Sequence, residues 1–348
     1  MIKVMLVDDS SLTLVILKKM LAQAPDIVVV GTACNGQEAL ALLPELQPDV
    51  ICTDLKMPVM DGLAFTKAVM TEFPRPILVI SAAVQSGDTS NIFNLMQAGA
   101  IDVIAKPSYV LTDESGMNAR DLINKIRVLS GVHVIARNKR AGQNSPAPAV
   151  PVKVQTSTPP QIIGIGASTG GPQALHQILT ALPANFPLPI VCVQHISEGF
   201  SLGLVNWLNQ DCELTVQFAE TGLTPEPGHV YFAPDNKQLE INAQKQLVCT
   251  SAPSYGGHLP SISVTLQSLA LRFGRQATGV LLTGMGCDGV DGLQSIKQVG
   301  GMTIAQDEAS SIVFGMPRAA IEEQAAQVVL PLAQIAPALV KLAMPHSV

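Results

Sequence analysis

Short apolar runs alternate with amphipathic stretches over about the first 135 residues of the chain. The apolar runs predict strands at residues 3–7, 27–32, 50–53, 77–81 and 102–105. Stretches such as 11–23 and 37–46 have the pattern of helices that connect these strands. Buried, β-branched strands that alternate with helices are typical of a doubly wound parallel sheet. The sequence therefore predicts a first α/β domain with five parallel strands.

The same alternation returns after residue 161. The clearest predicted strands there lie at residues 162–166, 190–194, 230–232, 279–283 and 302–305. Residues 214–250 are richer in strand and turn patterns, which leaves a mixed sheet open in that region. We expect a second α/β domain that is doubly wound and mainly parallel.

Between these two regions, residues 137–160 are rich in Ala, Pro, Gln, Ser and Thr. Such a segment buries too little apolar surface to fold, and it predicts an extended linker. The expected organisation is a first domain over residues 1–127, a helix end and Pro/Ala-rich linker over 128–160, and a second domain over 161–348. A length of 348 residues agrees with two domains.

Composition narrows the kinds of partner. A formal net charge of -6 with 14% charged residues argues against a nucleic-acid-binding surface, which needs clustered Lys and Arg. The amino terminus does not have the pattern of a signal peptide, and no stretch is apolar enough to cross a bilayer. We therefore expect a cytoplasmic protein without direct membrane insertion.

Polar side chains follow the predicted strands of the first domain. Asp8 and Asp9 come after the first strand and Asp54 after the third, while Ser81 ends the fourth and Lys106 follows the fifth. These strand ends meet at one edge of a doubly wound sheet. Three carboxylates there repel one another unless a divalent cation lies among them, and oxygen ligands suit Mg²⁺.

The same pattern assigns a role to each of these residues. It predicts that Asp54 accepts a phosphoryl group, and that Asp8, Asp9 and Mg²⁺ hold it. Lys106 would pair with the transferred group, and the Ser81 hydroxyl would contact its oxygens.

In the second domain, the predicted strand at 162–166 leads into a serine flanked by glycines, Gly166-x-Ser168-x-Gly170. This pattern fits a sharp strand-to-helix turn that exposes a nucleophilic hydroxyl. A dinucleotide loop is the alternative, but it needs an acidic residue at the end of the next strand. His195 follows that strand instead. A histidine there can act as the base that takes the serine proton.

A serine and histidine of this kind need an acid that orients the imidazole. The loop after residue 283 presents Asp288, and Asp291 and Asp307 remain competitors on spacing alone. The backbone N–H groups of Thr169 and the Met285 loop are the expected oxyanion donors. The expected role of the Thr169 hydroxyl is to cap the following helix.

Over residues 1–127 the chain resembles the receiver domain of two-component response regulators. The resemblance lies in the acidic residues, serine and lysine already named and in Met57-Pro58-x-Met60-Asp61-Gly62. It implies phosphorylation by a histidine kinase, with Mg²⁺ as cofactor. One departure is Val103, which stands where many receivers carry an aromatic switch residue, and it bears on how phosphorylation is relayed.

The second domain resembles the chemotaxis protein-glutamate methylesterases of the CheB family. The matching segments are residues 165–171, 194–195, 228–234, 282–289 and 314–317. The resemblance implies hydrolysis of glutamate γ-methyl esters on chemoreceptor cytoplasmic domains, with Ser168, His195 and Asp288 as the triad and no cofactor for this reaction. It also implies a glutamine deamidase activity. Departures at 197–200 and 258–263 bear on receptor preference.

The sequence thus favours a phosphorylation-regulated serine esterase, in which the unphosphorylated first domain is hypothesised to cover the active-site edge. One alternative is a phospho-controlled binding module without enzymatic activity, in which the serine loop holds an anion. A second is a DNA-binding regulator, against which the acidic balance counts.

Overall fold

The computed structural model describes residues 1–81, 89–107, 119–132, 134 and 158–344. The chain forms two compact units, which we describe one at a time. Most of the predicted linker, residues 133 and 135–157, lies outside the described residues. Within the described part, no helix combines the length and the apolar character that a membrane span requires.

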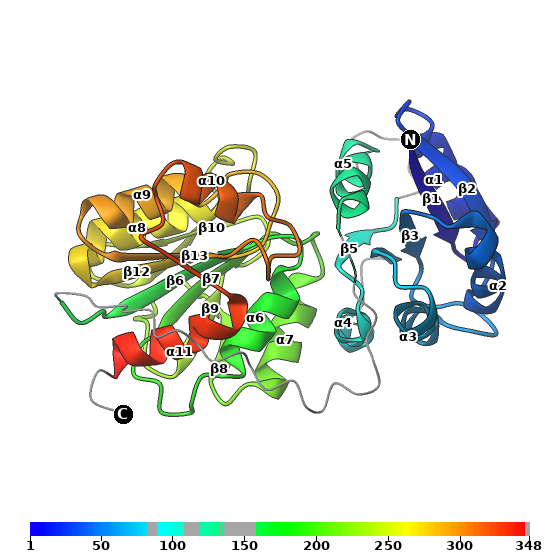
Figure 1. The fold of residues 1–348 in the computed structure, drawn as a ribbon. Coiled ribbons are helices and arrows are strands. Elements are labelled where there is room, and N and C mark those ends of the chain that lie inside the picture. Colours follow the sequence, from blue (N-terminus) through cyan, green and yellow to red (C-terminus); the bar gives the residue numbers. More distant parts are fainter. Residues whose placement is uncertain (82–88, 108–118, 133, 135–157, 345–348) are drawn as a thin grey trace. The chain divides into compact units, whose positions relative to one another are not determined.

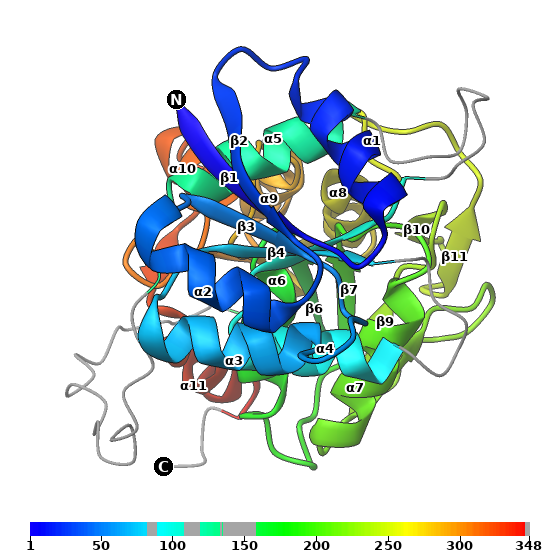
Figure 2. The same cartoon turned by 90° about the vertical axis from the view of Figure 1, so that its right-hand side faces the viewer.

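The first unit contains a five-stranded sheet in the order β2-β1-β3-β4-β5, and every neighbouring pair is parallel. Its strands are β1 Ile2–Val7, β2 Ile27–Ala33, β3 Val50–Thr53, β4 Ile77–Ser81 and β5 Asp102–Ala105. Its helices are α1 Ser11–Leu21, α2 Gly36–Leu46, α3 Gly62–Glu72, α4 Thr89–Ala98 and α5 Ala119–Ser130. Figure 2 shows α1 and α5 on one face of the sheet and α2, α3 and α4 on the other. The predicted five-stranded parallel fold is confirmed.

Local sequence explains where these helices begin. The side chains of Ser10, Asn35 and Asp61 accept hydrogen bonds from backbone N–H groups in the first turns of α1, α2 and α3. Such N-caps satisfy donors that the helix itself leaves unpaired. Helix α1 ends at Leu21, two residues before the predicted end. Lys18 and Lys19 in its last turn complement the helix dipole.

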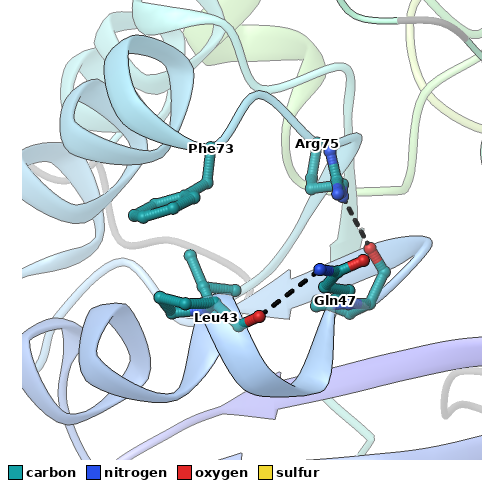
Figure 3. A pocket seen from close by; sticks show the side chains of 6 residues that line it. Leu43, Gln47, Phe73 and Arg75 are labelled. Carbon is teal, nitrogen blue, oxygen red and sulfur yellow. Dashed lines mark hydrogen bonds between the residues drawn. The ribbon is translucent and has the colours of Figure 1, made fainter.

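A cavity of about 210 Å³ lies at the amino-terminal ends of β3 and β4 (Figure 3). Its lining comprises Leu43, Pro44, Gln47, Pro48, Phe73 and Arg75. The Arg75 guanidinium donates hydrogen bonds to the carbonyls of Pro48 and Pro74, at 3.0 and 2.9 Å. Because Asp54 follows the carboxyl-terminal end of β3, this cavity lies at the opposite sheet edge from the predicted acidic site.

The second unit contains a seven-stranded sheet in the order β14-β13-β12-β6-β7-β9-β8, with all neighbours parallel. Its strands are β6 Ile162–Ala167, β7 Ile190–Gln194, β8 Thr215–Phe218, β9 His229–Phe232, β12 Ala277–Leu281, β13 Met302–Gln306 and β14 Val328–Leu330. Strands β10 Gln238–Ile241 and β11 Leu247–Thr250 form a separate antiparallel pair. Residues 214–250 therefore do not form a mixed sheet, the possibility that the sequence left open. Within the described residues, the antiparallel strands β10 and β11 pair only with each other.

Helices cover both faces of the seven-stranded sheet. They are α6 Gly171–Leu179, α7 Ser201–Asp211, α8 Ile262–Phe273, α9 Val290–Gln298, α10 Met316–Glu322 and α11 Leu332–Ala343, with a short 3₁₀ turn at Gly274–Gln276. Figure 1 shows α8, α9 and α10 on one face and α6, α7 and α11 on the other. Leu266, Leu269 and Leu293 are fully buried between α8, α9 and the sheet. The predicted doubly wound second domain is confirmed.

Candidate active site and phosphoacceptor site

The carboxyl ends of β1 and β3 bring the predicted carboxylates together in the first unit. Asp8 and Asp54 are 2% and 6% exposed, whereas Asp9 is exposed. One oxygen from each of these three residues lies within 4.8 Å of the others. Buried carboxylates this close repel one another, so the cluster needs positive charge nearby.

Lys106 supplies part of that charge. Its Nζ lies 2.6 Å from Asp54 Oδ2 and 2.7 Å from Asp8 Oδ2. Burial raises the pKa of Asp54, and the opposing effect of Lys106 does not fully offset it. Burial alone would lower the pKa of Lys106, but its hydrogen bonds to Asp54 and Asp8 outweigh burial and raise it. The lysine therefore stays charged beside the carboxylates.

The remaining predicted residues of this site are also at the same sheet edge. Ser81 is the buried last residue of β4, and the Lys106 N–H donates to its carbonyl at 2.7 Å. Val103 is fully buried in β5, opposite Val79 of β4. Three clustered carboxylate oxygens form a donor set that suits Mg²⁺, so the residues present fit the metal.

In the second unit, Ser168 lies at the turn between β6 and α6. Its N–H donates to the Thr283 carbonyl at 3.0 Å, and its carbonyl accepts from Gly171 N–H at 2.7 Å. Gly170 adopts a φ of 77°, a left-handed conformation that favours glycine. A Cβ on Gly166 would come within 2.2 Å of the Ile262 side chain. Glycine is therefore required on the two sides of Ser168 for different reasons. Gly170 adopts the left-handed conformation of the turn, and Gly166 leaves space for the side chain of Ile262 on α8.

His195 follows β7, the strand next to β6. Its N–H donates to the Ala167 carbonyl at 2.9 Å, which places it beside the serine turn. His195 Nε2 lies 3.0 Å from Asp288 Oδ2. His195 Nδ1 is buried and has no hydrogen-bond partner among the described residues. The structure therefore brings the predicted serine, histidine and aspartate to neighbouring strand ends.

Asp288 is held by the amino terminus of α8. Its Oδ1 accepts from Ser261 Oγ at 2.9 Å and from Ser263 N–H at 3.0 Å, and its Oδ2 accepts from Ile262 N–H at 2.8 Å. Burial opposes ionisation of Asp288, but the hydrogen bonds from His195 and Ser263 lower its pKa well below the usual range. Asp288 is therefore ionised and fixed in place.

The competing acids bond to other side chains. Asp291 Oδ2 accepts the Tyr255 hydroxyl at 2.8 Å, and Asp307 Oδ1 accepts the Ser310 hydroxyl at 2.6 Å. Among the described residues, Asp288 is the acid whose carboxylate lies within hydrogen-bond distance of His195. Spacing left this choice open, and the contact with His195 favours Asp288.

The proposed oxyanion donors flank the serine. Thr169 is buried directly after Ser168, and Met285 is 42% exposed on the loop after β12. The preceding residue, Gly284, approaches so closely that a Cβ there would lie 2.6 Å from Ser168 Cβ. The N-cap residue of α6 is Gly170, so Thr169 lies one residue before the N-cap position that was predicted for it. Gly170 takes that place because its left-handed φ ends the turn.

Sequence reasoning did not assign roles to several residues that support the site. Gln194 Nε2 donates to the carbonyls of Ser168 and His195, at 2.8 and 2.7 Å. Thr283 Oγ1 donates to the Thr169 carbonyl at 2.9 Å. The His258 ring stacks on the His195 ring, with centroids 4.3 Å apart. Gln194 and Thr283 are polar residues next to predicted site segments, and His258 lies in the segment 258–263 that differs from the family pattern. These positions in the sequence are the signal that could have identified them.

The first unit is a parallel α/β fold with a buried cluster of carboxylates and a lysine. The second unit brings a serine, a histidine and an aspartate to its strand ends. Together these features define the class of receiver-linked serine hydrolases. The model of the response regulator receiver domain matches residues 4–112, and the model of the CheB methylesterase matches residues 163–339. The chain belongs to the CheB methylesterase family.

Relatives match over nearly the whole chain. A protein-glutamate methylesterase/protein-glutamine glutaminase 1 of Syntrophus aciditrophicus is 42% identical over 99% of each chain. A protein-glutamate methylesterase/protein-glutamine glutaminase 3 of Myxococcus xanthus is 42% identical over 96% of this chain and 92% of its own. The crystal structure of the Thermotoga maritima CheB methylesterase catalytic domain matches with a TM-score of 0.51 and 40% identity, covering 53% of this chain and 100% of that domain.

Proposed function

We propose that this protein hydrolyses glutamate γ-methyl esters on the cytoplasmic domains of chemoreceptors, and that phosphorylation at Asp54 activates it. The observation that carries the proposal is the His195–Asp288 pair beside the Ser168 turn. The family membership and the names of its relatives supply the substrate class.

The hydrogen bond to Asp288 supports one arrangement of protons on the His195 imidazole. Because Asp288 is ionised, it accepts a hydrogen bond from Nε2–H, and the neutral ring then carries its lone pair on Nδ1. Nδ1 takes the Ser168 hydroxyl proton as Oγ attacks the ester carbonyl. Asp288 stabilises the imidazolium that forms.

The tetrahedral intermediate then collapses to products. The Thr169 and Met285 N–H groups stabilise its oxyanion, and the adjacent amino terminus of α6 favours negative charge there. His195 returns the proton to the methoxide, which leaves as methanol and gives an acyl-Ser168. A water molecule then loses a proton to His195 and attacks the acyl carbon. The bond to Ser168 Oγ breaks, His195 returns the proton to this oxygen, and the glutamate side chain is released.

The same site accommodates a glutamine side chain, since only the leaving group differs. His195 would protonate the leaving nitrogen, and ammonia would depart in place of methanol. The relatives named as protein-glutamine glutaminases support this second activity. Neither reaction assigns a cofactor to the second unit.

In the first unit, Asp54 accepts a phosphoryl group from a histidine kinase. Asp8, Asp9 and Asp54 would hold Mg²⁺, which supplies positive charge to the phosphoryl oxygens. Lys106 pairs with the transferred group, and the Ser81 hydroxyl contacts its oxygens. The receptor domains and the kinase are cytoplasmic partners, so we assign the protein to the cytoplasm. We assign it no nucleic-acid partner.

Replacing the nucleophile tests the esterase. In full-length protein with a phosphodonor and methylated receptors, Ser168→Ala is expected to lower methanol release by about 10⁶-fold, as loss of a triad nucleophile does. The matched control is Ser295→Ala, because that hydroxyl donates to the Asp291 carbonyl of its own helix. Methanol release that Ser168→Ala leaves unchanged would rule out Ser168 as the nucleophile, whereas wild type that releases no methanol would favour the non-enzymatic binding module.

A further inference from the structure

The His258 ring lies flat against the His195 ring. The ring centroids are 4.3 Å apart, and the two planes differ by 1°. The backbone of His258 is fixed by a reciprocal pair of hydrogen bonds with Tyr255, each 3.0 Å long. Three residues later, Ser261 donates its hydroxyl to Asp288. One short segment therefore holds both the aspartate and a second imidazole against His195.

His258 is electrically neutral at neutral pH. Burial lowers its pKa, the nearby His195 lowers it further, and attraction to Asp288 only partly opposes them. These two are the titratable groups that act on its ring, while Tyr255 on the same turn is bonded to Asp291. The neutral His258 ring therefore presents its π face to His195. This face cannot bind a proton, so it does not compete with His195 for one.

The reaction changes the charge of only one of the two rings. While His195 is neutral, the contact is an ordinary aromatic stack. Once His195 holds the serine proton, it is a cation 4.3 Å from a neutral aromatic face, within the range of a cation–π interaction. An interaction that strengthens only as the proton moves lowers the barrier.

Metal binding is the competing use of these side chains. Ligand atoms of His195, His258 and Asp288 lie within 4.8 Å of one another. However, the lone pair of an imidazole nitrogen lies in its ring plane, and two stacked, parallel rings direct their lone pairs into separate planes. The observed stack therefore fits an aromatic platform better than a chelate.

We propose that His258 is a positioning residue for the esterase, whose neutral ring fixes the plane of His195 and stabilises the protonated form of that base. The inference rests on the proposed function, because it concerns the same proton transfer. Removing the aromatic face is expected to lower kcat by about 2- to 30-fold, the range that a cation–π contact spans. KM should change little, because the contact does not involve the substrate.

Two apolar replacements separate the aromatic face from simple packing. In full-length protein with a phosphodonor, His258→Phe keeps a face over His195, whereas His258→Leu fills similar space without one. We expect His258→Phe to stay near wild-type kcat and His258→Leu to show the loss. The acidic limb of the kcat/KM profile, which reports protonation of the base, should lie at lower pH in His258→Leu than in His258→Phe. The position of this limb does not depend on how much of a variant folds.

Each outcome decides a separate question. Equal kcat and equal acidic limbs for the two variants would reduce His258 to a packing residue and overturn the inference. Tight binding of Zn²⁺ to wild type but not to His258→Phe, with inhibition of wild type alone, would assign the His258 ring to a metal site. This result would also overturn the inference. Failure of the esterase itself is distinguishable, since wild type would then release no more methanol than Ser168→Ala.

Discussion

At the scale of single residues, the bond between Asp288 and His195 determines how the imidazole can act. Asp288 pairs with Nε2, which leaves the buried Nδ1 as the nitrogen available to the serine. Five hydrogen bonds from backbone and side-chain donors hold the carboxylate of Asp288: those from His195, Ser261, Ile262, Ser263 and Gly289. In the proposed mechanism, the aspartate thereby orients the base and compensates the charge that the base gains.

Asp288→Asn tests this assignment. The uncharged amide no longer favours the Nε2–H tautomer or the imidazolium, so we expect kcat for methanol release to fall by about 10⁴-fold, as in other serine triads. The control is Asp291→Asn, whose oxygen can still accept the Tyr255 hydroxyl and which should keep wild-type kcat. A larger loss in Asp291→Asn than in Asp288→Asn would reverse the choice of acid.

At the scale of elements, helix α8 connects the core to Asp288, the proposed catalytic acid. Its N-cap residue, Ser261, is fully buried, accepts from Val264 N–H and donates its hydroxyl to Asp288. The buried apolar face of the helix packs on β6, where Gly164 and Gly166 leave room for Leu266 and Ile262. Packing of α8 therefore fixes the position of Asp288 relative to the serine strand.

Ser261→Ala should affect both stability and turnover. Loss of the cap is expected to lower the free energy of unfolding by about 1 kcal/mol. Loss of the bond to Asp288 should also lower kcat. Asn35→Ala removes the cap of α2 at a comparable cost in stability, but it lies outside the active site and should keep wild-type kcat. Chemical denaturation and methanol release measure the two effects. Equal kcat in both variants would contradict a role for Ser261 beyond capping.

At the scale of the whole molecule, a phosphoacceptor unit and a hydrolase unit share one chain. Our hypothesis is that the unphosphorylated first unit restrains the esterase and that phosphorylation of Asp54 removes the restraint. Residues 161–348 should fold alone, because the catalytic domain of the Thermotoga maritima relative, matched over its full length, was crystallised as a domain.

Two proteins test the restraint together. Full-length Asp54→Asn should keep its unphosphorylated rate of methanol release when a phosphodonor is added, because the acceptor oxygen is lost. The 161–348 fragment should exceed that rate without a phosphodonor. A fragment no faster than unphosphorylated full-length protein would contradict the inhibitory arrangement, and a phosphodonor response in Asp54→Asn would contradict the acceptor assignment.

The sequence predicted most of the fold because its signals are local. Apolar runs located ten strands of the two parallel sheets to within a few residues, and turn residues separated them. It missed β14, whose three residues carry too short a pattern, and it did not separate β8, β10 and β11 within residues 214–250 or predict their pairing. Pairing depends on neighbours distant in the chain, which a local pattern does not contain.

By itself, the sequence determined which chemical groups stand at the strand ends, since strand periodicity and residue type are both local properties. Only the tertiary structure decided how those groups meet. His195 and Asp288 are 93 residues apart in the chain, and their 3.0 Å contact favours Asp288 over its competitors and supports the proposal that Nδ1 is the base. The stack of His258 on His195 likewise arises only when α8 and its preceding turn pack against the sheet.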